Sequence, residues 1–188
     1  MILHCTKKLY ALLPEQAKER APVVPSIGLQ SEWNNWHANV ITVQRKQCLI
    51  AVHDATRFAL FIPGLLKKDW ANLDWHFEDV LINTLLKSDI AHELIEVAAA
   101  NLKPLAFDTT YNRSVQGTMN QISQEIDYDL YYNWPSIKDI SPYRYSANLS
   151  HRPCNTKDHK NCFWPDKRMA ELLTKLAGYE HRTGAYFQ

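Results

Sequence analysis

The sequence predicts a single α+β domain, in which a small, mainly antiparallel sheet is flanked by four or five helices. Three apolar, strand-like runs follow one another between residues 36 and 62, and short polar turns separate them. Beyond residue 72, apolar residues recur at the spacing of amphipathic helices. Neither an internal repeat nor a linker-like composition divides the 188 residues, so we place one domain over residues 1–188.

The N-terminal segment has the composition of a strand that leads into a helix. Residues 2–5 are apolar, and Thr6 is a suitable cap for a helix that continues to about Leu13, because Pro14 cannot continue it. Residues 14–35 are polar and rich in proline, which predicts a long surface loop.

The three strand-like runs span residues 36–43, 48–53 and 57–62, and Pro63 with Gly64 is expected to end the last one. The second and third runs are continuously apolar. Such runs are typical of strands that are covered on both faces, so we expect a layer of structure on each side of the sheet.

Helical spacing predicts the elements in the remainder of the chain. The expected helices cover residues 73–85, 94–102 and 112–133 and a segment that starts at Pro165, with a short strand at 105–109. We expect irregular structure over residues 135–165 and a C-terminal tail over about 178–188.

Composition excludes several classes of protein. Apolar residues make up 46% and charged residues 22% of the chain, and the net charge is +1, so general attraction to nucleic acid or to an anionic membrane has no support. No apolar run has the length of a membrane span, and the first residues lack the pattern of a signal peptide. Four scattered cysteines do not form a secreted disulfide framework. We expect a cytoplasmic protein without a membrane partner.

One short segment has the residue types of a metal site. His151, Cys154, His159 and Cys162 lie within twelve residues, and two short pairs of such ligands can surround zinc. The spacing is not a common zinc-finger pattern. The alternative is a polar surface loop that contains these residues by chance, so we expect no cofactor and keep zinc as the possible exception.

The start of the helix at residue 112 is the second candidate. Arg113, Gly117, Asn120 and Gln124 form a polar stripe opposite the apolar one. A glycine inside a helix costs about 1 kcal/mol relative to alanine, which suggests that a ligand, a partner or another element of the chain approaches closely. Asn112 and Ser114 can cap the helix or, together with Arg113, bind an anion.

The third candidate combines aromatic, amide and basic groups. Trp36, His37 and Asn39 precede a turn that contains Arg45, and such groups can stack on and hydrogen-bond to nucleobases, or can simply anchor a strand. His4 belongs to the first strand. The chain contains no phosphate-binding glycine loop, dinucleotide fingerprint, nucleophile elbow or His-Glu-x-x-His motif.

Several segments together resemble an uncharacterised bacterial family, the domain of unknown function 6933. They are residues 2–9 (ILHCTKKL), 36–39 (WHAN), 112–120 (NRSVQGTMN), 148–149 (NL), 152–153 (RP) and 164–165 (WP). The resemblance implies one domain. The family pattern lacks the histidines and cysteines between Pro153 and Trp164, which disfavours a structural zinc. Family members are associated with mobile or accessory genes, which implies a role in defence or as part of a toxin–antitoxin pair.

Two functional hypotheses follow. The first is a binding module for a protein partner or an anionic ligand, with nucleic acid as one possibility. Its polar surface would consist of His4, Lys7, Trp36, His37, Asn39, Arg45, Asn112, Arg113, Ser114 and Asn120. The alternative is a metal-independent nuclease or other phosphotransfer enzyme, in which His4 or His37 is the general base and Arg113 or Lys7 stabilises developing charge.

Overall fold

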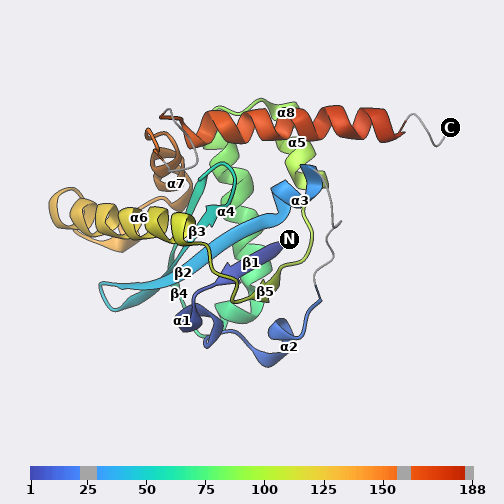
Figure 1. Cartoon of the computed structure of the whole chain (residues 1–188). Coiled ribbons are helices and arrows are strands. Elements are labelled where there is room, and N and C mark those ends of the chain that lie inside the picture. The colour runs from blue at the N-terminus through green and yellow to red at the C-terminus, as the bar shows by residue number, and fades with distance from the viewer. Residues whose placement is uncertain (22–28, 156–161, 185–188) are drawn as a thin grey trace.

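A computed structural model describes residues 1–21, 29–155 and 162–184 of the chain. Its centre is a five-stranded sheet in the order β4-β3-β2-β1-β5 (Figure 1). The strands are β1 (Ile2–Cys5), β2 (Asn35–Val43), β3 (Lys46–His53), β4 (Ala59–Leu65) and β5 (Ala106–Asp108). The α+β class is therefore confirmed.

The sheet is mixed rather than mainly antiparallel. The meander β2–β3–β4 is antiparallel, but β1 pairs in parallel with both β2 and β5. Parallel neighbours need a long crossover connection, and the chain between β1 and β2 supplies one. Part of that connection is helical, so the prediction of an irregular loop over residues 14–35 is wrong where α2 and α3 form.

Helices make up much of the rest of the described chain. They are α1 (Lys7–Tyr10), α2 (Glu15–Lys18), α3 (Leu29–Asn34), α4 (Leu73–Lys87), α5 (His92–Ala100), α6 (Arg113–Tyr132), α7 (Pro142–Ser150) and α8 (Pro165–Gly184), with 3-10 turns at Asp69–Asn72 and Ile137–Asp139. No helix in the described ranges is both long and apolar enough to cross a membrane.

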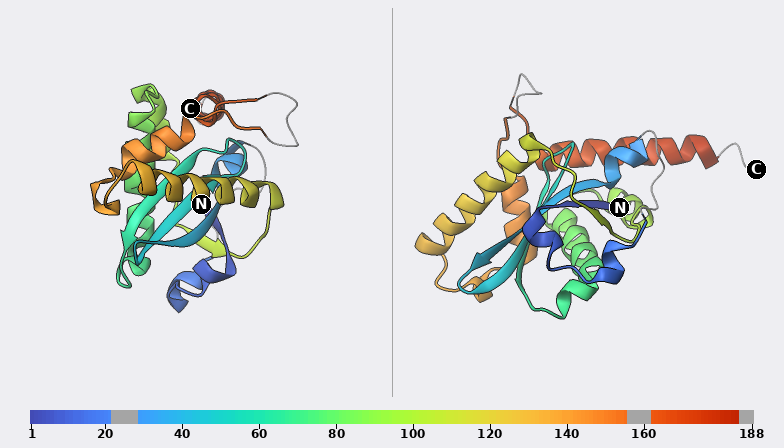
Figure 2. Two further views of the ribbon diagram at one scale, coloured as in Figure 1. Left: turned by 90° about the vertical axis from the view of Figure 1, so that its left-hand side faces the viewer. Right: turned by 60° about the horizontal axis from the view of Figure 1, so that its bottom comes forward.

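Each face of the sheet has its own apolar core, which confirms the prediction from the continuously apolar strands. On one face, residues such as Leu3 and Trp36 pack with α4, α5 and α8. On the other face, Ile50 and Phe61 pack with α6 and α7. Figure 2 shows the sheet between the α6 layer and the α4 and α5 layer. Alternation along each strand thus decides which side chains meet which layer.

The helix α7 protects the free edge of β4. The hydroxyl of Ser146 accepts a hydrogen bond from the backbone N–H of Phe61 at 2.8 Å, and that of Ser150 accepts one from Ala59 at 3.0 Å. The Ser150 hydroxyl also donates to the Ala59 carbonyl at 3.2 Å. Two serines one helical turn apart therefore take the place of a neighbouring strand. The prediction of irregular structure over residues 135–165 is wrong here.

Other element boundaries differ for local reasons. The strand β4 begins at Ala59 because Arg57 has a left-handed φ of 62° and belongs to the turn. It continues through Pro63 and Gly64, where the register against β3 shifts, because an edge strand tolerates a residue without an N–H group. The expected helix from Thr6 to Leu13 is only α1, and the expected tail over 178–188 is helical as far as Gly184.

Candidate functional site

Three neighbouring strands place three polar side chains in one row. In the sheet register, His4 of β1 is paired with His37 of β2 on one side and with Asp108 of β5 on the other. Residues paired across a parallel ladder project to the same face. Leu3 and Cys5 of β1 project to the opposite face, into the core beneath α4. The row therefore lies on the same face of the sheet as α6.

Each histidine of the row is bound to a carboxylate through its Nδ1 atom. His4 Nδ1 lies 2.6 Å from Oδ1 of Asp108, and His37 Nδ1 lies 2.6 Å from Oδ1 of Asp54, which follows β3. The two imidazole rings are 4.8 Å apart between centroids. The result is a compact cluster in the order Asp108, His4, His37, Asp54.

The hydrogen bonds of this cluster restrict the protonation of the rings. A carboxylate accepts from Nδ1–H, so Nε2 of a neutral ring carries a lone pair. Nε2 of His37 is buried and has no hydrogen-bond partner among the described residues. Nε2 of His4 lies 3.3 Å from Oδ1 of Asn35, a long contact that a competing ligand can replace at little cost. Buried nitrogens that lack a partner are uncommon and point to a water, an ion or a functional role.

Burial differs along the cluster. The His37 side chain is 1% exposed and that of His4 10%, whereas the carboxylates of Asp54 and Asp108 are 23% and 43% exposed. Burial of Asp108 opposes its ionisation, but hydrogen bonds from His4 and the backbone N–H of Thr110 outweigh it and lower its pKa. Asp108 is therefore ionised at neutral pH, and its carboxylate can orient the His4 ring.

The neighbouring thiol takes no part. Burial, and secondly the charge of Asp108, raise the pKa of Cys5 to about 12. Its Sγ atom lies 3.2 Å from the carbonyl of Leu3, on the opposite face of β1. A thiol in this state is neither a nucleophile nor a metal ligand.

The turn that carries Asp54 is linked to the start of α6. Arg57 donates to the backbone carbonyl of Asp54 and, at 3.1 Å, to the hydroxyl of Ser114. Asn112 caps the helix by accepting from the N–H groups of Ser114 and Val115, which is the capping role that its position predicts. A cleft of about 400 Å³ borders this turn. Its lining includes Asp54, Arg57, Asn112, Arg168, Glu171 and Lys175.

The structure brings together only part of the predicted surface. His4 and His37 form the centre, Asn39 accepts from the hydroxyl of Thr6 at 2.8 Å, and Asn112 and Ser114 lie at the linked start of α6. The remaining predicted cations, Lys7, Arg45 and Arg113, are exposed, as is Asn120. Among the described residues, no hydrogen bond or ion pair joins any of these three cations to either histidine.

One prediction about this surface is wrong, and for Gly117 the structure excludes one of three alternatives, close packing by another element of the described chain. Trp36 offers no stacking face, because its side chain is completely buried and its ring packs edge-on against Phe77 at 5.1 Å between centroids. Nothing in the described chain approaches Gly117, since a Cβ atom built there meets no atom within 4 Å. The polar stripe of α6 faces open space.

The four ligands proposed for zinc do not converge in the part of the chain that the structure describes. His159 lies outside the described residues. His151 pairs with Asp166 at 2.5 Å, Cys154 is buried in a β-bridge with Phe163, and Cys162 is exposed. Within the described ranges, the group of histidine, cysteine and carboxylate side chains close enough to hold an ion is His4, His37 and Asp54. Zinc binding by the 151–162 segment stays a prediction.

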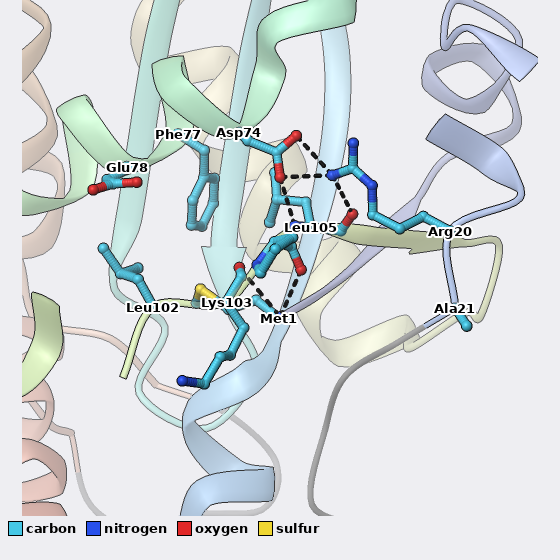
Figure 3. Close-up of a pocket in the computed structure, with 10 residues that line it drawn as sticks. Met1, Arg20, Ala21, Asp74, Phe77, Glu78, Leu102, Lys103 and Leu105 are labelled. Atoms are coloured by element: carbon cyan, nitrogen blue, oxygen red, sulfur yellow. Dashed lines mark hydrogen bonds and ion pairs between the residues drawn. The ribbon is translucent and has the colours of Figure 1, made fainter. Parts of the chain in front are cut away.

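A second cavity, of about 590 Å³, lies beside α4, and its lining includes charged groups that pair with one another (Figure 3). The Met1 amino group donates to the carbonyl of Pro104 at 3.1 Å, and burial lowers its pKa to about 6. Arg20 contacts both carboxylate oxygens of Asp74 at 2.8 Å. The first contact joins the start of β1 to the segment before β5, and the second joins the segment after α2 to α4, so we assign this cavity a structural role.

Sequence reasoning missed the two carboxylates and Arg57. Asp54 directly follows the predicted strand at 48–53, and Asp108 lies near the end of the predicted strand at 105–109. Polar residues at strand ends were a usable signal. Without the strand order, however, nothing in the sequence assigns either carboxylate to a histidine.

The comparison with protein families agrees with the resemblance noted in the sequence. Residues 2–168 match the family described as Domain of unknown function (DUF6933). The chain belongs to this family. The match covers all five strands and the complete Asp–His–His–Asp cluster, so the cluster lies within the family domain. No curated protein matches the chain at a significant level.

Proposed function

We propose that the protein is a binding module whose ligand site is the cluster of His4, His37, Asp54 and Asp108. One observation carries the proposal: adjacent strands align two histidines and bring a carboxylate to each, on a part of the sheet where α6 begins. A cytoplasmic location and a bacterial origin stay predictions from the sequence and the family resemblance.

The energetics support a binding role over a purely structural one. A buried polar group without a partner costs about 1–3 kcal/mol, and Nε2 of His37 is such a group. An apolar side chain at this position would avoid that cost while filling the same space. The chain instead retains two imidazoles and two carboxylates beside an apolar core, which is the pattern of a site that a ligand completes.

A ligand panel with matched variants tests the proposal. Thermal unfolding of the wild type, His4→Gln and His92→Gln is measured with divalent cations, phosphate, nucleotides and a short RNA. His92 is exposed on α5, so its variant controls for loss of a histidine. A ligand present at about 100 times its Kd adds about 2.7 kcal/mol of stability. We expect one ligand class to stabilise the wild type and His92→Gln but not His4→Gln; equal shifts in all three proteins would contradict the proposal.

The second candidate function is an acid–base enzyme that cleaves or transfers phosphoryl groups without a metal. The specific observation in its favour is that Asp108 orients His4, the more exposed histidine, as acid–base catalysis requires. Arg113 and Lys7 do not stabilise charge at this histidine through any contact in the described chain. The cation beside the cluster is Arg57.

This candidate has its own test. Hydrolysis of a chromogenic phosphodiester and of RNA is followed for the wild type and His4→Gln, each with and without a chelator. Activity that survives the chelator and is lost in His4→Gln would support metal-free catalysis. Activity that is equal in both proteins would come from a contaminant or from another site.

A further inference from the structure

We infer that the ligand of this cluster is a divalent transition-metal ion, held by one nitrogen each of His4 and His37 and by a carboxylate oxygen of Asp54. The inference rests on the proposed binding site and names its ligand. It concerns a different place from the histidines and cysteines of residues 151–162.

The donor atoms already converge. One ligand atom from each of the three residues lies within 4.8 Å of the other two. Ligands of a tetrahedral ion at about 2.1 Å are roughly 3.4 Å from one another, so small side-chain rotations are enough to close the site.

The hydrogen bond between His4 and Asp108 favours metal coordination by the other ring nitrogen of His4. Its Nδ1 atom is held by Asp108, which leaves the lone pair on Nε2. Metal-binding histidines usually donate their second nitrogen to a carboxylate in this way, which fixes both the tautomer and the ring orientation. The amide oxygen of Asn35, 3.3 Å from the same Nε2, is a further oxygen beside the ion position. The cluster thus supplies two nitrogens, a carboxylate oxygen and a supporting carboxylate.

The charge of the cluster favours a cation over the anion expected from the sequence. The cluster itself contains two carboxylates, those of Asp54 and Asp108, and each contacts a histidine. An anion at the histidines would face both carboxylates. The donor set of imidazole and carboxylate suits zinc, cobalt, nickel or copper better than magnesium or calcium, which prefer oxygen alone.

Metal binding is measured directly with zinc chloride and cobalt chloride, by calorimetry and by equilibrium dialysis of the full chain. We expect one ion per chain at this site. His4→Gln and Asp54→Asn should each weaken binding at least about 100-fold, because each removes a ligand, and Asp108→Asn should weaken it about 10–100-fold, because it removes only the orienting contact. His92→Gln should bind as the wild type does.

Two controls distinguish metal binding at His4 from metal binding by residues 151–162 and from a loss of folding. A double variant, His151→Gln with Cys162→Ser, removes ligands of the other candidate segment and should leave the ion at His4 in place. Chemical denaturation of each variant shows whether it is folded. Asp108 is nearly half exposed, so Asp108→Asn provides a readout that does not depend on a buried substitution.

The outcomes are distinct. Binding that is lost in the double variant and kept in His4→Gln and Asp54→Asn would overturn the inference, because the ion would belong to residues 151–162. The absence of zinc and cobalt binding at millimolar concentration would also overturn it. If phosphate or RNA then stabilised the wild type but not His4→Gln, the proposed binding site would stand and only its ligand would be wrong.

Discussion

Replacement of Ser150 by alanine should destabilise the protein strongly, although the substitution is small. The Ser150 hydroxyl is fully buried and serves both backbone groups of Ala59, accepting from its N–H at 3.0 Å and donating to its carbonyl at 3.2 Å. Alanine leaves both groups at the edge of β4 without a partner. A buried group that loses its partner costs about 1–3 kcal/mol.

Two such groups predict a loss of about 2–4 kcal/mol, since the carbonyl is the cheaper of the two to leave unpaired. For a chain of this size, 1 kcal/mol shifts the melting temperature by about 2–4 °C, so a decrease of roughly 5–15 °C is expected. Ser146→Ala removes one partner, that of the Phe61 N–H, and should cost about 1–3 kcal/mol.

Urea unfolding monitored by tryptophan fluorescence gives the free energies, and an unchanged slope shows that the surface exposed on unfolding is the same. Ser141→Ala is the matched control, because Ser141 precedes α7, is exposed and makes no capping bond. It should change stability by less than about 0.5 kcal/mol. If Ser150→Ala were as stable as Ser141→Ala, the hydroxyls of α7 would not be what satisfies the edge of β4.

Three further predictions follow from other parts of the structure. Gly117→Ala should stabilise the protein by about 1 kcal/mol in urea unfolding, because a Cβ there meets open space in mid-helix, and a loss of stability would contradict this open environment. Burial lowers the pKa of His53 to about 4 from its ordinary value of 6.5, so only the unfolded chain gains a proton between these values. Stability should therefore fall by about 3 kcal/mol as the pH decreases from 6.5 to 4, and His53→Gln should remove that part of the slope. At the cluster, zinc affinity should decrease as the pH is lowered, because protons compete with the metal for the imidazole nitrogens, and a pH-independent affinity would exclude histidine ligands.

Local sequence patterns predicted the elements whose burial is regular. The meander follows from continuously apolar strands, and α6 follows from Val115, Met119, Ile122 and Ile126 at helical spacing together with the Asn112 cap. The helix α7 escaped this reasoning because Ser146 and Ser150 are buried on its inner face as hydrogen-bonding groups. Buried serines look like solvent-exposed residues in a pattern that counts only apolar side chains.

Local sequence patterns predicted the two histidines of the candidate site but not their carboxylate partners. His4 and His37 attracted notice through their positions in strands, but their partners depend on which strands are neighbours. The position of Arg113 at the start of α6 predicts that it supplies the charge, whereas the structure brings the guanidinium of Arg57 to Ser114 at the same helix start. Trp36 was misassigned because alternation in β2 turns its ring to the face opposite His37.

The sequence by itself determined the α+β class, the two-sided burial of the meander, the capped start of α6 and membership of the family, because each depends on the order of residues along the chain and not on which distant segments meet. Only the tertiary structure decided that β1 lies between β2 and β5. That strand order, set by long-range packing of the crossover helices, places Asp108 beside His4 and His4 beside His37, although more than a hundred residues separate the first pair. The chemistry of the cluster therefore depends on pairings that no local pattern contains.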